Sequence, residues 1–188
     1  MNRCPWSEHP EMEAYHDTEW GVPVQDDRIH FEFLLLESAQ AGLSWLTILR
    51  KREGYRKAFA DFNPERVACY DQSRIDELLQ DPGIIRNRRK VEAAVKNAGC
   101  FLKIQESFGS FSQYIWDFVD GRPVVGNWIR QEDIPAESEL SKRISKDLKQ
   151  RGFGFLGPVI IYSHLQATGL INDHITSCFR YREICDTY

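Results

Sequence analysis

The sequence has no apolar run long enough to cross a membrane. Residues 33–36 form one of its longest apolar stretches, and a spanning helix needs about 20 such residues. The first ten residues, MNRCPWSEHP, also lack the apolar segment of a signal peptide. We therefore expect a cytoplasmic protein with no membrane partner.

Cysteine is scarce, and its number is odd. The chain has five cysteines: Cys4, Cys69, Cys100, Cys178 and Cys185. An odd set spread along a cytoplasmic chain argues against a disulfide framework. Reduced thiols are then available to bind a metal ion.

Internal repeats, low-complexity tracts and flexible linkers are also missing. The 188 residues, 42% hydrophobic and 28% charged, suit one folded domain spanning residues 1–188. Strand-like alternation persists nowhere except in RPVV, residues 122–125. We predict an all-α protein, with helices over residues 29–40, 45–62, 73–80, 88–105, 110–119, 139–151 and 158–169.

The charges are segregated. The net charge of -4 argues weakly against a nucleic-acid partner. Residues 8–37 contain nine acids and one base, Arg28, whereas residues 86–90 hold four bases in five positions. Residues 141–151 carry five bases against Asp147. This distribution is compatible with a basic surface that binds DNA.

Two cysteines and two histidines form a candidate metal site. His174 and Cys178 are four residues apart, so on a helix they would share one face and grip one ion. Cys4 and His16 supply a second pair from the other end of the chain. Two thiolates and two imidazoles suit zinc in a closed tetrahedral site. Such a site would staple the N-terminal segment to the C-terminal segment.

On spacing alone, the alternative is that His16 is a loop histidine and that Cys4 and Cys178 are ordinary thiols. Cys69 and Cys100 fall within helical apolar patterns, so we interpret both as core residues. Cys185 receives no assignment.

The segment LLQDPGIIRNRRK, residues 78–90, has the form of two short helices joined by a tight Pro-Gly turn. Gly83 would let a partner approach the backbone, and the amides that open the following helix favour an anion. Four bases follow at once: Arg86, Arg88, Arg89 and Lys90. A DNA phosphate would suit this hairpin region, residues 74–98. The alternative is a plain helical corner with a solvated basic face.

Residues 14–23, AYHDTEWGVP, show neither helical nor strand periodicity and interleave polar tips with aromatic faces. That composition indicates a site. Glu37 comes directly after three leucines, and a carboxylate buried beside apolar surface needs donors, which a substrate could provide. The alternative is that Glu37 faces solvent.

The turn after Glu37 is a candidate wedge. It carries Gln40, Gly42, Leu43 and then Trp45. An exposed leucine at a tight turn, beside a stacking ring, can unstack a base. The alternative is that Leu43 and Trp45 belong to the core.

Taken together and in this order, these features resemble the 3-methyladenine DNA glycosylase I family, the constitutive alkylation-repair enzymes of bacteria. The matching segments are RCPW, AYHDTEWGVP, ESAQAGLSWLTILRKREGYRKAF, DPGIIRNRRKVEAAVKNA, RGFGFLGP and GLINDHITSC. They extend from Cys4 to Cys178. The resemblance implies a helix-hairpin-helix glycosylase fold, with a cleft between two helical lobes. The hairpin departs from the usual pattern, because Ile85 stands where a second glycine is common.

The resemblance also implies a set of site residues. Zinc would be the one cofactor, with no organic group, and would join residues 4–16 to residues 174–178 through Cys4, His16, His174 and Cys178. The base pocket would fall on Tyr15, Glu37 and Trp45, with Trp6 and Trp20 as walls. The implied partner is alkylated double-stranded DNA, bound by a monomer. Its contacts would fall on Gln40, Gly42, Leu43, Gly83, Arg86, Arg88 and Arg89.

The implied reaction hydrolyses the N-glycosidic bond of 3-methyladenine and leaves free base and an abasic site. Trp45 would stack on the cationic ring, Glu37 would recognise the amino edge, and Tyr15 would add a polar contact. Asp173 matches the catalytic aspartate of related glycosylases, and a role in supporting the metal or in capping is equally expected. No lysine in these motifs suits a Schiff base, so we predict no strand-cutting activity.

Two alternatives remain at this point. One is a related glycosylase that acts on another damaged base, because the pocket residues define an adenine-like edge only through the resemblance. The other is a non-catalytic, zinc-stabilised DNA-binding module, which would use the hairpin but would not need Glu37 and Trp45 in a cavity. A closed pocket at Glu37 would favour an enzyme.

Overall fold

The computed structural model describes residues 1–187 and is mostly helical; the last residue of the predicted domain, 188, lies outside the described residues. The α-helices are α1 (Pro10–Thr18), α2 (Asp27–Gln40), α3 (Trp45–Ala58), α4 (Pro64–Ala68), α5 (Gln72–Leu78), α6 (Arg88–Phe108), α7 (Phe111–Trp116), α8 (Glu139–Gln150), α9 (Pro158–Ala167) and α10 (Phe179–Cys185). Short 3-10 turns are η1 (Pro5–Ser7), η2 (Ala60–Phe62), η3 (Asp117–Val119) and η4 (Gln131–Asp133).

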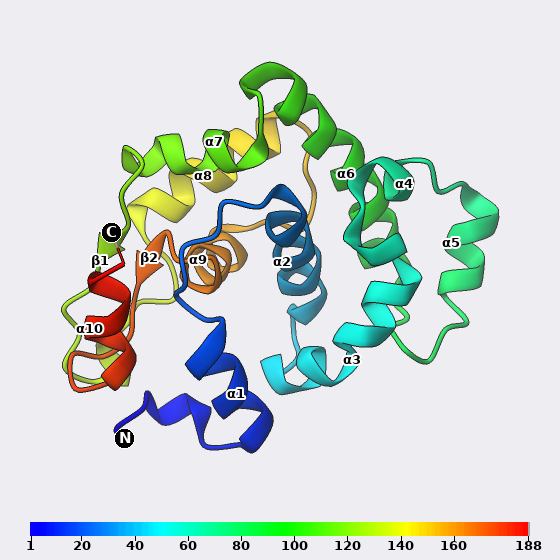
Figure 1. Ribbon diagram of the computed structural model, residues 1–188. Coiled ribbons are helices and arrows are strands. Elements are labelled where there is room, and N and C mark those ends of the chain that lie inside the picture. The colour runs from blue at the N-terminus through cyan, green and yellow to red at the C-terminus, as the bar shows by residue number, and fades with distance from the viewer. Residues whose placement is uncertain (188) are drawn as a thin grey trace.

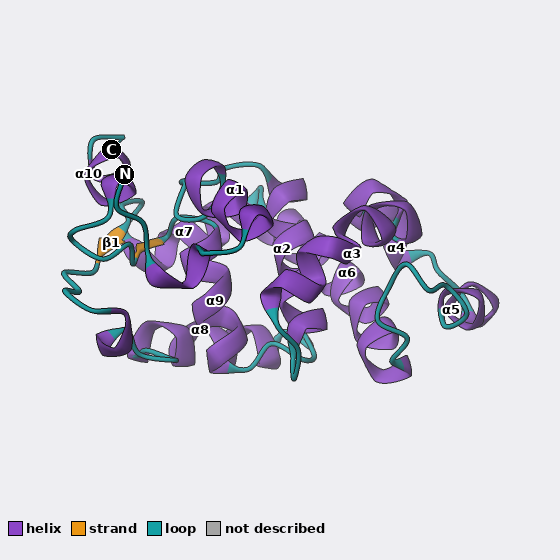
Figure 2. Cartoon of the chain, turned by 90° about the horizontal axis from the view of Figure 1, so that it is seen from below, coloured by secondary structure: helices purple, strands orange, loops and turns teal. Residues whose placement is uncertain are grey.

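Helix α2 lies in the middle of the molecule. Figure 1 shows α3 to α6 on one side of it and α7 to α10 on the other, and Figure 2 shows the same order from below. Both views place the N-terminal end of the chain next to α10. The N–H of Phe179 donates to the carbonyl oxygen of Asn2 at 2.9 Å, so the ends are tied together by the backbone as well.

Side chains cap the starts of α2 and α3. The carboxylate of Asp26 accepts the N–H groups of Arg28 and Ile29 at the start of α2, and the Ser44 hydroxyl accepts the Thr47 N–H at the start of α3. These bonds satisfy amides that have no intrahelical partner. Residues 30–39 of α2 are all buried, so most of this helix is shielded from solvent.

Helix α3 ends earlier than predicted. It stops at Ala58 rather than at residue 62, because Ala60, Asp61 and Phe62 take positive φ angles of 51°, 57° and 54°. This left-handed turn places the Phe62 side chain fully inside the core. Burial of a large aromatic side chain offsets the cost of a backbone conformation that non-glycine residues rarely adopt.

The protein is not purely helical. Strands β1 (Val124–Val125) and β2 (Ile171–Asn172) pair in parallel, with Val124 opposite Ile171. The strand-like pattern at residues 122–125 therefore marked a real strand, and the all-α prediction needs this correction. The pairing matters for the site, because β2 leads directly into the segment that contains His174.

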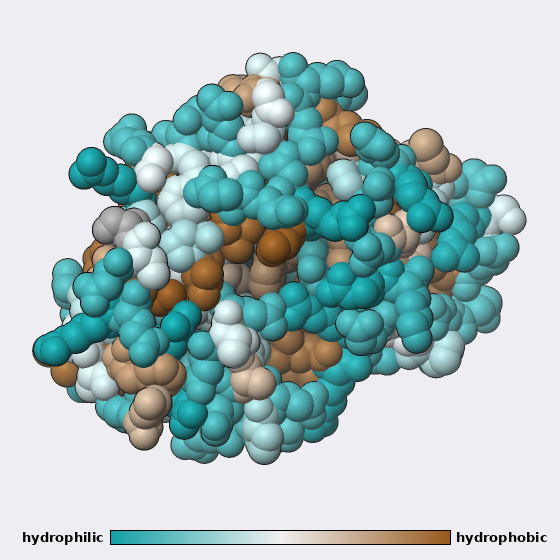
Figure 3. Space-filling view, viewed as in Figure 1, coloured by the Kyte–Doolittle hydropathy of each residue, from teal (hydrophilic) through white to brown (hydrophobic). Residues whose placement is uncertain are grey.

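Buried side chains form two clusters. The larger one is built around α2, α6 and α9, and the smaller one includes Cys4, Tyr15, Trp20 and Cys178. Hydrophilic side chains cover most of the face seen in Figure 3. Within residues 1–187, no helix combines the length and the apolar character that a membrane crossing requires.

The interpretation of Cys69 and Cys100 as core residues is right for only one of them. Cys100 is buried against the core, as predicted, whereas Cys69 is exposed. Cys69 follows the last residue of α4, where the chain leaves the helix and its side chain no longer follows the helical apolar pattern.

Candidate active site and metal centre

The four predicted ligands come together. The ligand atoms of Cys4, His16, His174 and Cys178 all lie within 4.8 Å of one another, and all four residues are buried. The Cys178 sulfur lies 3.4 Å from Nε2 of His16 and 3.5 Å from Nδ1 of His174. The Cys4 sulfur lies 3.6 Å from the same Nδ1 atom. This cluster could hold one metal ion.

The outward nitrogen of each imidazole is held by the protein. Nδ1 of His16 lies 2.8 Å from a carboxylate oxygen of Asp17, and Nε2 of His174 lies 3.0 Å from the carbonyl oxygen of Trp20. Because these oxygens accept hydrogen bonds, each outward nitrogen carries the proton and the inward one presents its lone pair. Arg3 holds the Asp17 carboxylate in turn, with a shortest distance of 2.7 Å.

His174 and Cys178 are not on a helix, so the conformation predicted for them is wrong. They belong to the loop between β2 and α10, and Cys178 precedes the first residue of α10. The His174 N–H donates to Oδ1 of Asn172 at 3.3 Å, and the Cys178 N–H donates to the carbonyl oxygen of Ile175 at 2.8 Å. These two bonds shape a turn that brings the side chains together.

The thiols differ in acidity. Hydrogen bonding from Cys4, assisted by the rings of His16 and His174, lowers the pKa of the Cys178 thiol. Thiolate is the form of cysteine that binds a metal ion. The buried cluster therefore already favours a negative charge at its centre.

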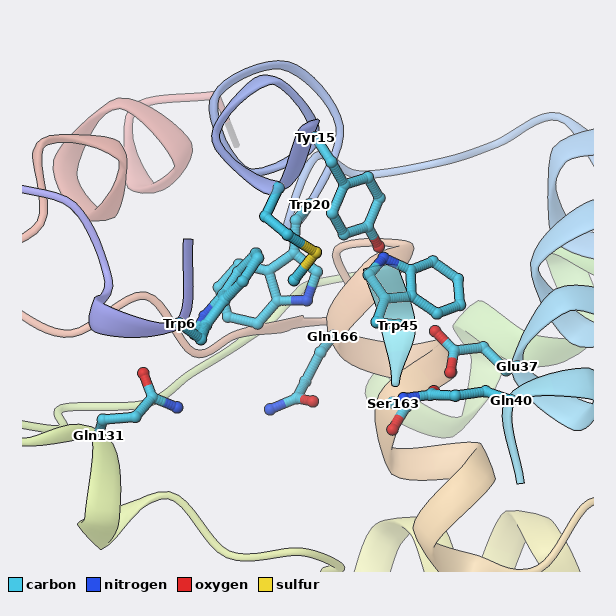
Figure 4. Close-up of a pocket in the computed structure, with 10 residues that line it drawn as sticks. Trp6, Tyr15, Trp20, Glu37, Gln40, Trp45, Gln131, Ser163 and Gln166 are labelled. Carbon is cyan, nitrogen blue, oxygen red and sulfur yellow. The ribbon is translucent and has the colours of Figure 1, made fainter. Parts of the chain in front are cut away.

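Figure 4 shows a cavity of about 240 Å³. Two of its lining residues, Trp6 and Trp20, contact the rings of His16 and His174. Its lining residues are Trp6, Met12, Tyr15, Trp20, Glu37, Gln40, Trp45, Gln131, Ser163 and Gln166. The predicted pocket residues all line it. Met12, Gln131, Ser163 and Gln166 were not predicted, because each is a single polar or flexible side chain outside any recognisable motif.

Aromatic side chains flank the cavity in two pairs. The rings of Trp6 and Trp20 are 5.0 Å apart and nearly perpendicular, and those of Tyr15 and Trp45 are 5.4 Å apart and tilted by 49°. Figure 4 shows the first pair on one side of the cavity and the second pair on the other. A flat ring bound between the two pairs would contact aromatic side chains on both sides.

Glu37 projects from α2 towards the cavity (Figure 4) and is only 3% exposed. Burial raises the pKa of its carboxyl group to about 8. Among the described residues, its Oε2 atom and the Nε1 atom of Trp45 are buried without a hydrogen-bond partner. A buried polar atom costs free energy unless it is paired. Glu37 and Trp45 can therefore form hydrogen bonds with a ligand in the cavity.

A tight turn connects α2 to α3 at the cavity. The Leu43 N–H donates to the carbonyl oxygen of Gln40 at 2.6 Å, and Gly42 has a φ of +81°. Leu43 is 39% exposed, as a wedge requires. The alternative that Leu43 is a core residue is therefore wrong.

The hairpin turn is built differently from the prediction. The Gly83 N–H donates to the carboxylate of Asp81 at 2.7 Å, so that amide is already engaged. The second helix, α6, begins at Arg88 as predicted and runs to Phe108, three residues beyond the predicted end. Gly54 of α3 allows the hairpin to pack closely, because a Cβ atom there would lie 2.2 Å from the Gly83 carbonyl oxygen.

The four bases after the hairpin have different surroundings. Arg88 binds the carboxylates of Asp76 and Glu92. Lys90 turns inward and donates to backbone carbonyl groups. Arg86 and Arg89 are exposed and form no ion pair within residues 1–187. The free positive charge of this segment is therefore carried by these two arginines.

Asp173 is fully buried and surrounded by donors. Its carboxylate accepts hydrogen bonds from Trp128 at 2.6 Å, from Tyr162 at 2.5 Å and from Gln166 at 2.9 Å. Each oxygen already holds at least one donor. Asp173 therefore fastens the loop before α8 and the helix α9 to the metal-binding segment, and it orients the pocket residue Gln166.

A structural comparison defines the class of protein. The fold aligns with a crystal structure of 3-methyladenine DNA glycosylase I at a TM-score of 0.92 and 47% identity, over 95% of this chain and 98% of that one. The enzyme of this name from Staphylococcus aureus, described for its recognition of 3-methyladenine, aligns at 0.92 and 44% identity, over 95% and 96% of the two chains. The fold is therefore that of the solved 3-methyladenine DNA glycosylase I structures.

Sequence comparison gives the family. The family model for methyladenine glycosylase matches residues 6–181. DNA-3-methyladenine glycosylase 1 of Escherichia coli is 44% identical over 182 residues, which cover 96% of this chain and 97% of that protein. The chain belongs to the methyladenine glycosylase family, so the resemblance seen in the sequence motifs is confirmed.

Proposed function

We propose that this protein is a monofunctional DNA glycosylase that removes 3-methyladenine from alkylated double-stranded DNA and leaves an abasic site. The observation that carries the proposal is the unpartnered carboxylate of Glu37, buried in a cavity with aromatic walls. Membership of the methyladenine glycosylase family supports the same activity. A DNA-binding module without catalysis would have no use for this cavity.

The pocket suits a cationic base. Methylation of adenine at N3 leaves the base positively charged in DNA, and the base departs neutral, so little acid catalysis is needed. A cation between aromatic rings gains a cation–π contact that neutral adenine lacks. The same cation beside Glu37 would lower the pKa of that carboxyl from its raised value and ionise it.

Each pocket residue then has a role in recognition. Glu37 receives the amino edge and the charge of the base, Trp45 stacks on the ring, and Tyr15 adds a polar contact. Trp6 and Trp20 close the opposite wall. Because a residue bound to the base edge is poorly placed to reach the far face of the sugar, we assign Glu37 to recognition rather than to water activation.

We propose zinc as the ion of the Cys4, His16, His174 and Cys178 cluster, with no organic cofactor. In a regular tetrahedron with Zn–S of about 2.3 Å and Zn–N of about 2.0–2.1 Å, sulfur and nitrogen lie about 3.6 Å apart. The observed sulfur–nitrogen distances of 3.4–3.6 Å fit that edge. When bound, zinc supplies structural cross-linking, because four protein ligands leave no open position.

The zinc site and the pocket share one segment. His16 faces the metal cluster while Tyr15, the residue before it, lines the pocket. The ring of Trp6 lies 5.2 Å from that of His16. Fixing residues 4–16 to residues 174–178 therefore fixes two pocket walls, which is the function we propose for the interleaved stretch AYHDTEWGVP.

We propose that a monomer in the cytoplasm binds DNA across the α2–α3 turn and the hairpin, in the helix-hairpin-helix manner. Leu43, beside Gly42 and Gln40, would enter the space left by the extruded base. The hairpin at Gly83 and the first turn of α6 would face a phosphate, since the first intrahelical bond of α6 comes only from the Val91 N–H.

Removing Arg86 and Arg89 together should weaken duplex binding and lower its dependence on salt. Each phosphate contact contributes about 0.9 to the slope of log affinity against log salt, so Arg86→Gln/Arg89→Gln should reduce the slope by about 2. Arg88→Gln should change it less, because Arg88 already binds two carboxylates. The measurement is fluorescence anisotropy of a labelled duplex between 50 and 200 mM salt, concentrations of the order at which such contacts are screened.

Lys96→Gln serves as the control for that experiment, because Lys96 is exposed further along the same helix. An unchanged slope in the double variant would show that the hairpin is only a helical corner.

The proposed activity is tested by base release. Zinc-loaded protein is incubated with methylated duplex DNA and with unmodified DNA, and the released purines are separated by chromatography. We expect selective release of 3-methyladenine over 7-methylguanine and none from unmodified DNA. Selective release of a different methylated purine would identify a related glycosylase, and no release by folded protein would contradict the proposal.

A further inference from the structure

The carbonyl groups at the end of α2 have an unusual set of partners. The last carbonyls of a helix lack intrahelical donors and need others. The Gln40 carbonyl accepts the Leu43 N–H inside the turn. The carbonyl oxygens on either side of it, those of Ala39 and Ala41, both accept from the Lys90 ammonium, at 2.8 and 2.7 Å. One side chain from α6 therefore holds the turn at two points.

Lys90 lies in the first turn of α6. Its own N–H donates to the side chain of Asn87, the residue that caps this helix. The ammonium is close to the negative end of the α2 dipole, which favours a cation there. Its half-buried position differs from the exposed positions of Arg86 and Arg89 nearby, so Lys90 is directed away from the surface that those arginines form.

The turn has little else to define its shape. A Cβ atom added at Gly42 would meet no atom within 4 Å, so this part of the chain projects from the body. Leu43 is exposed as well. Backbone that lacks packing keeps one conformation only through its hydrogen bonds, and the Lys90 ammonium supplies two of them.

We propose that Lys90 is a positioning residue that holds the Gln40–Leu43 turn in the shape needed to unstack the damaged base. It joins the end of α6 that meets the phosphate to the turn that enters the duplex, so backbone binding and wedge insertion stay in register. The proposal rests on the proposed glycosylase function. Lys90 touches neither the base nor the sugar, because its ammonium is occupied by the backbone of α2.

The role is separated from simple stability by comparing substrates. The variant Lys90→Met keeps the length of the stem and removes the ammonium, whereas Lys90→Arg keeps charged donors. Lys96→Met is the control, as an exposed lysine on the same helix. Each protein is measured for single-turnover release of 3-methyladenine from duplex DNA and from single-stranded DNA, and for binding of free 3-methyladenine by quenching of tryptophan fluorescence.

We expect Lys90→Met to lose about tenfold in release from duplex DNA, a loss of the size that removal of charged hydrogen bonds produces. Release from single-stranded DNA should fall by less than about threefold, because the base there is already accessible. Affinity for the free base should stay within about twofold, and Lys90→Arg should recover most of the duplex activity. Lys96→Met should match the wild type on both substrates.

A duplex rate for Lys90→Met equal to that of the wild type would overturn the proposal, and so would equal losses on the two DNA substrates. If Lys90→Met does not fold, Lys90→Gln takes its place with the same expectations. Failure of the wild type to release base from either substrate would instead refute the glycosylase function itself, and the ratio between the two substrates keeps the two questions apart.

Discussion

Replacing Glu37 with glutamine should yield a protein that is more stable and almost inactive. The carboxyl group is fully buried, and burial raises its pKa from 4.5 to about 8. Between these values the unfolded chain is ionised while the folded chain must stay protonated. Glu37 therefore costs stability increasingly as the pH rises from about 4.5 to about 8, and glutamine removes that cost.

The expected gain at pH 7 is about 1–3 kcal/mol, because the amide of glutamine also pays for burial without a partner. In a chain of this size such a gain raises the melting temperature by roughly 2–12 °C. Thermal unfolding at pH 5 and pH 8 measures it, and the difference between wild type and variant should grow with pH. Glu106→Gln, which replaces an exposed carboxylate of α6, should leave the melting temperature unchanged at both pH 5 and pH 8.

The same variant should release 3-methyladenine about 100 times more slowly than the wild type. An amide cannot neutralise the charged base, and loss of one preorganised charge interaction in a buried site costs about 3 kcal/mol. Single-turnover release from methylated duplex DNA measures the rate. Full activity in Glu37→Gln at normal DNA affinity would show that the pocket has been assigned incorrectly.

Removal of one metal ligand should cause the largest loss of stability. Cys178→Ser should purify with far less than one zinc ion per chain, while wild type carries one. Because the free energy of structural zinc binding contributes to folding, we expect a loss of about 4 kcal/mol or more, or a fall in melting temperature of about 8–16 °C. Base release should be lost as well, because Trp6 and Tyr15 depend on the same segment.

Cys69→Ser is the matched control, since Cys69 is exposed and lies outside the ligand cluster. The two measurements are metal analysis of protein purified without added zinc and thermal unfolding with and without a chelator. If wild-type protein contains little zinc and melts at the same temperature as Cys178→Ser, the four residues are an ordinary buried cluster.

Local signals in the sequence were enough to predict most helices. Asp26, Ser44 and Ser138, residues of types that favour the start of a helix, accept N–H groups at the starts of α2, α3 and α8. What local signals do not report is competition from distant packing. Helix α3 ends at Ala58 because Phe62 is drawn into the core, and no residue within that segment indicates this.

The ligand cluster shows how a correct grouping of four residues can rest on a wrong intermediate step. The spacing of His174 and Cys178 predicted a shared helical face, but a turn fixed by Asn172 and Ile175 brings them together. The resemblance of the whole set of motifs was the stronger ground for that prediction. Strand β2 is only two residues long. Such a short strand gives no clear signal in the sequence, so nothing indicated that His174 and Cys178 do not lie on a helix.

The pocket was predictable only in part. Tyr15, Glu37 and Trp45 lie in motifs that the sequence displays, whereas Ser163 and Gln166 come from α9, which reads as an ordinary apolar helix. Lys90 was grouped with three neighbouring bases, and its inward direction depends on the end of α2, which is about 50 residues away in the chain. Such long-range contacts are decided by the fold.

The central claim is that Glu37, in its ionised form, receives a positively charged base. Its most direct test is the pH dependence of kcat/KM for 3-methyladenine release, which reports ionisations of the free enzyme. The carboxyl pKa of about 8 predicts that kcat/KM rises with pH, is half-maximal near pH 8 and levels off above it, and that Glu37→Gln shows no such rise. A wild-type profile that is flat or falls from pH 6 to pH 9, or one shared by both proteins, would contradict the account.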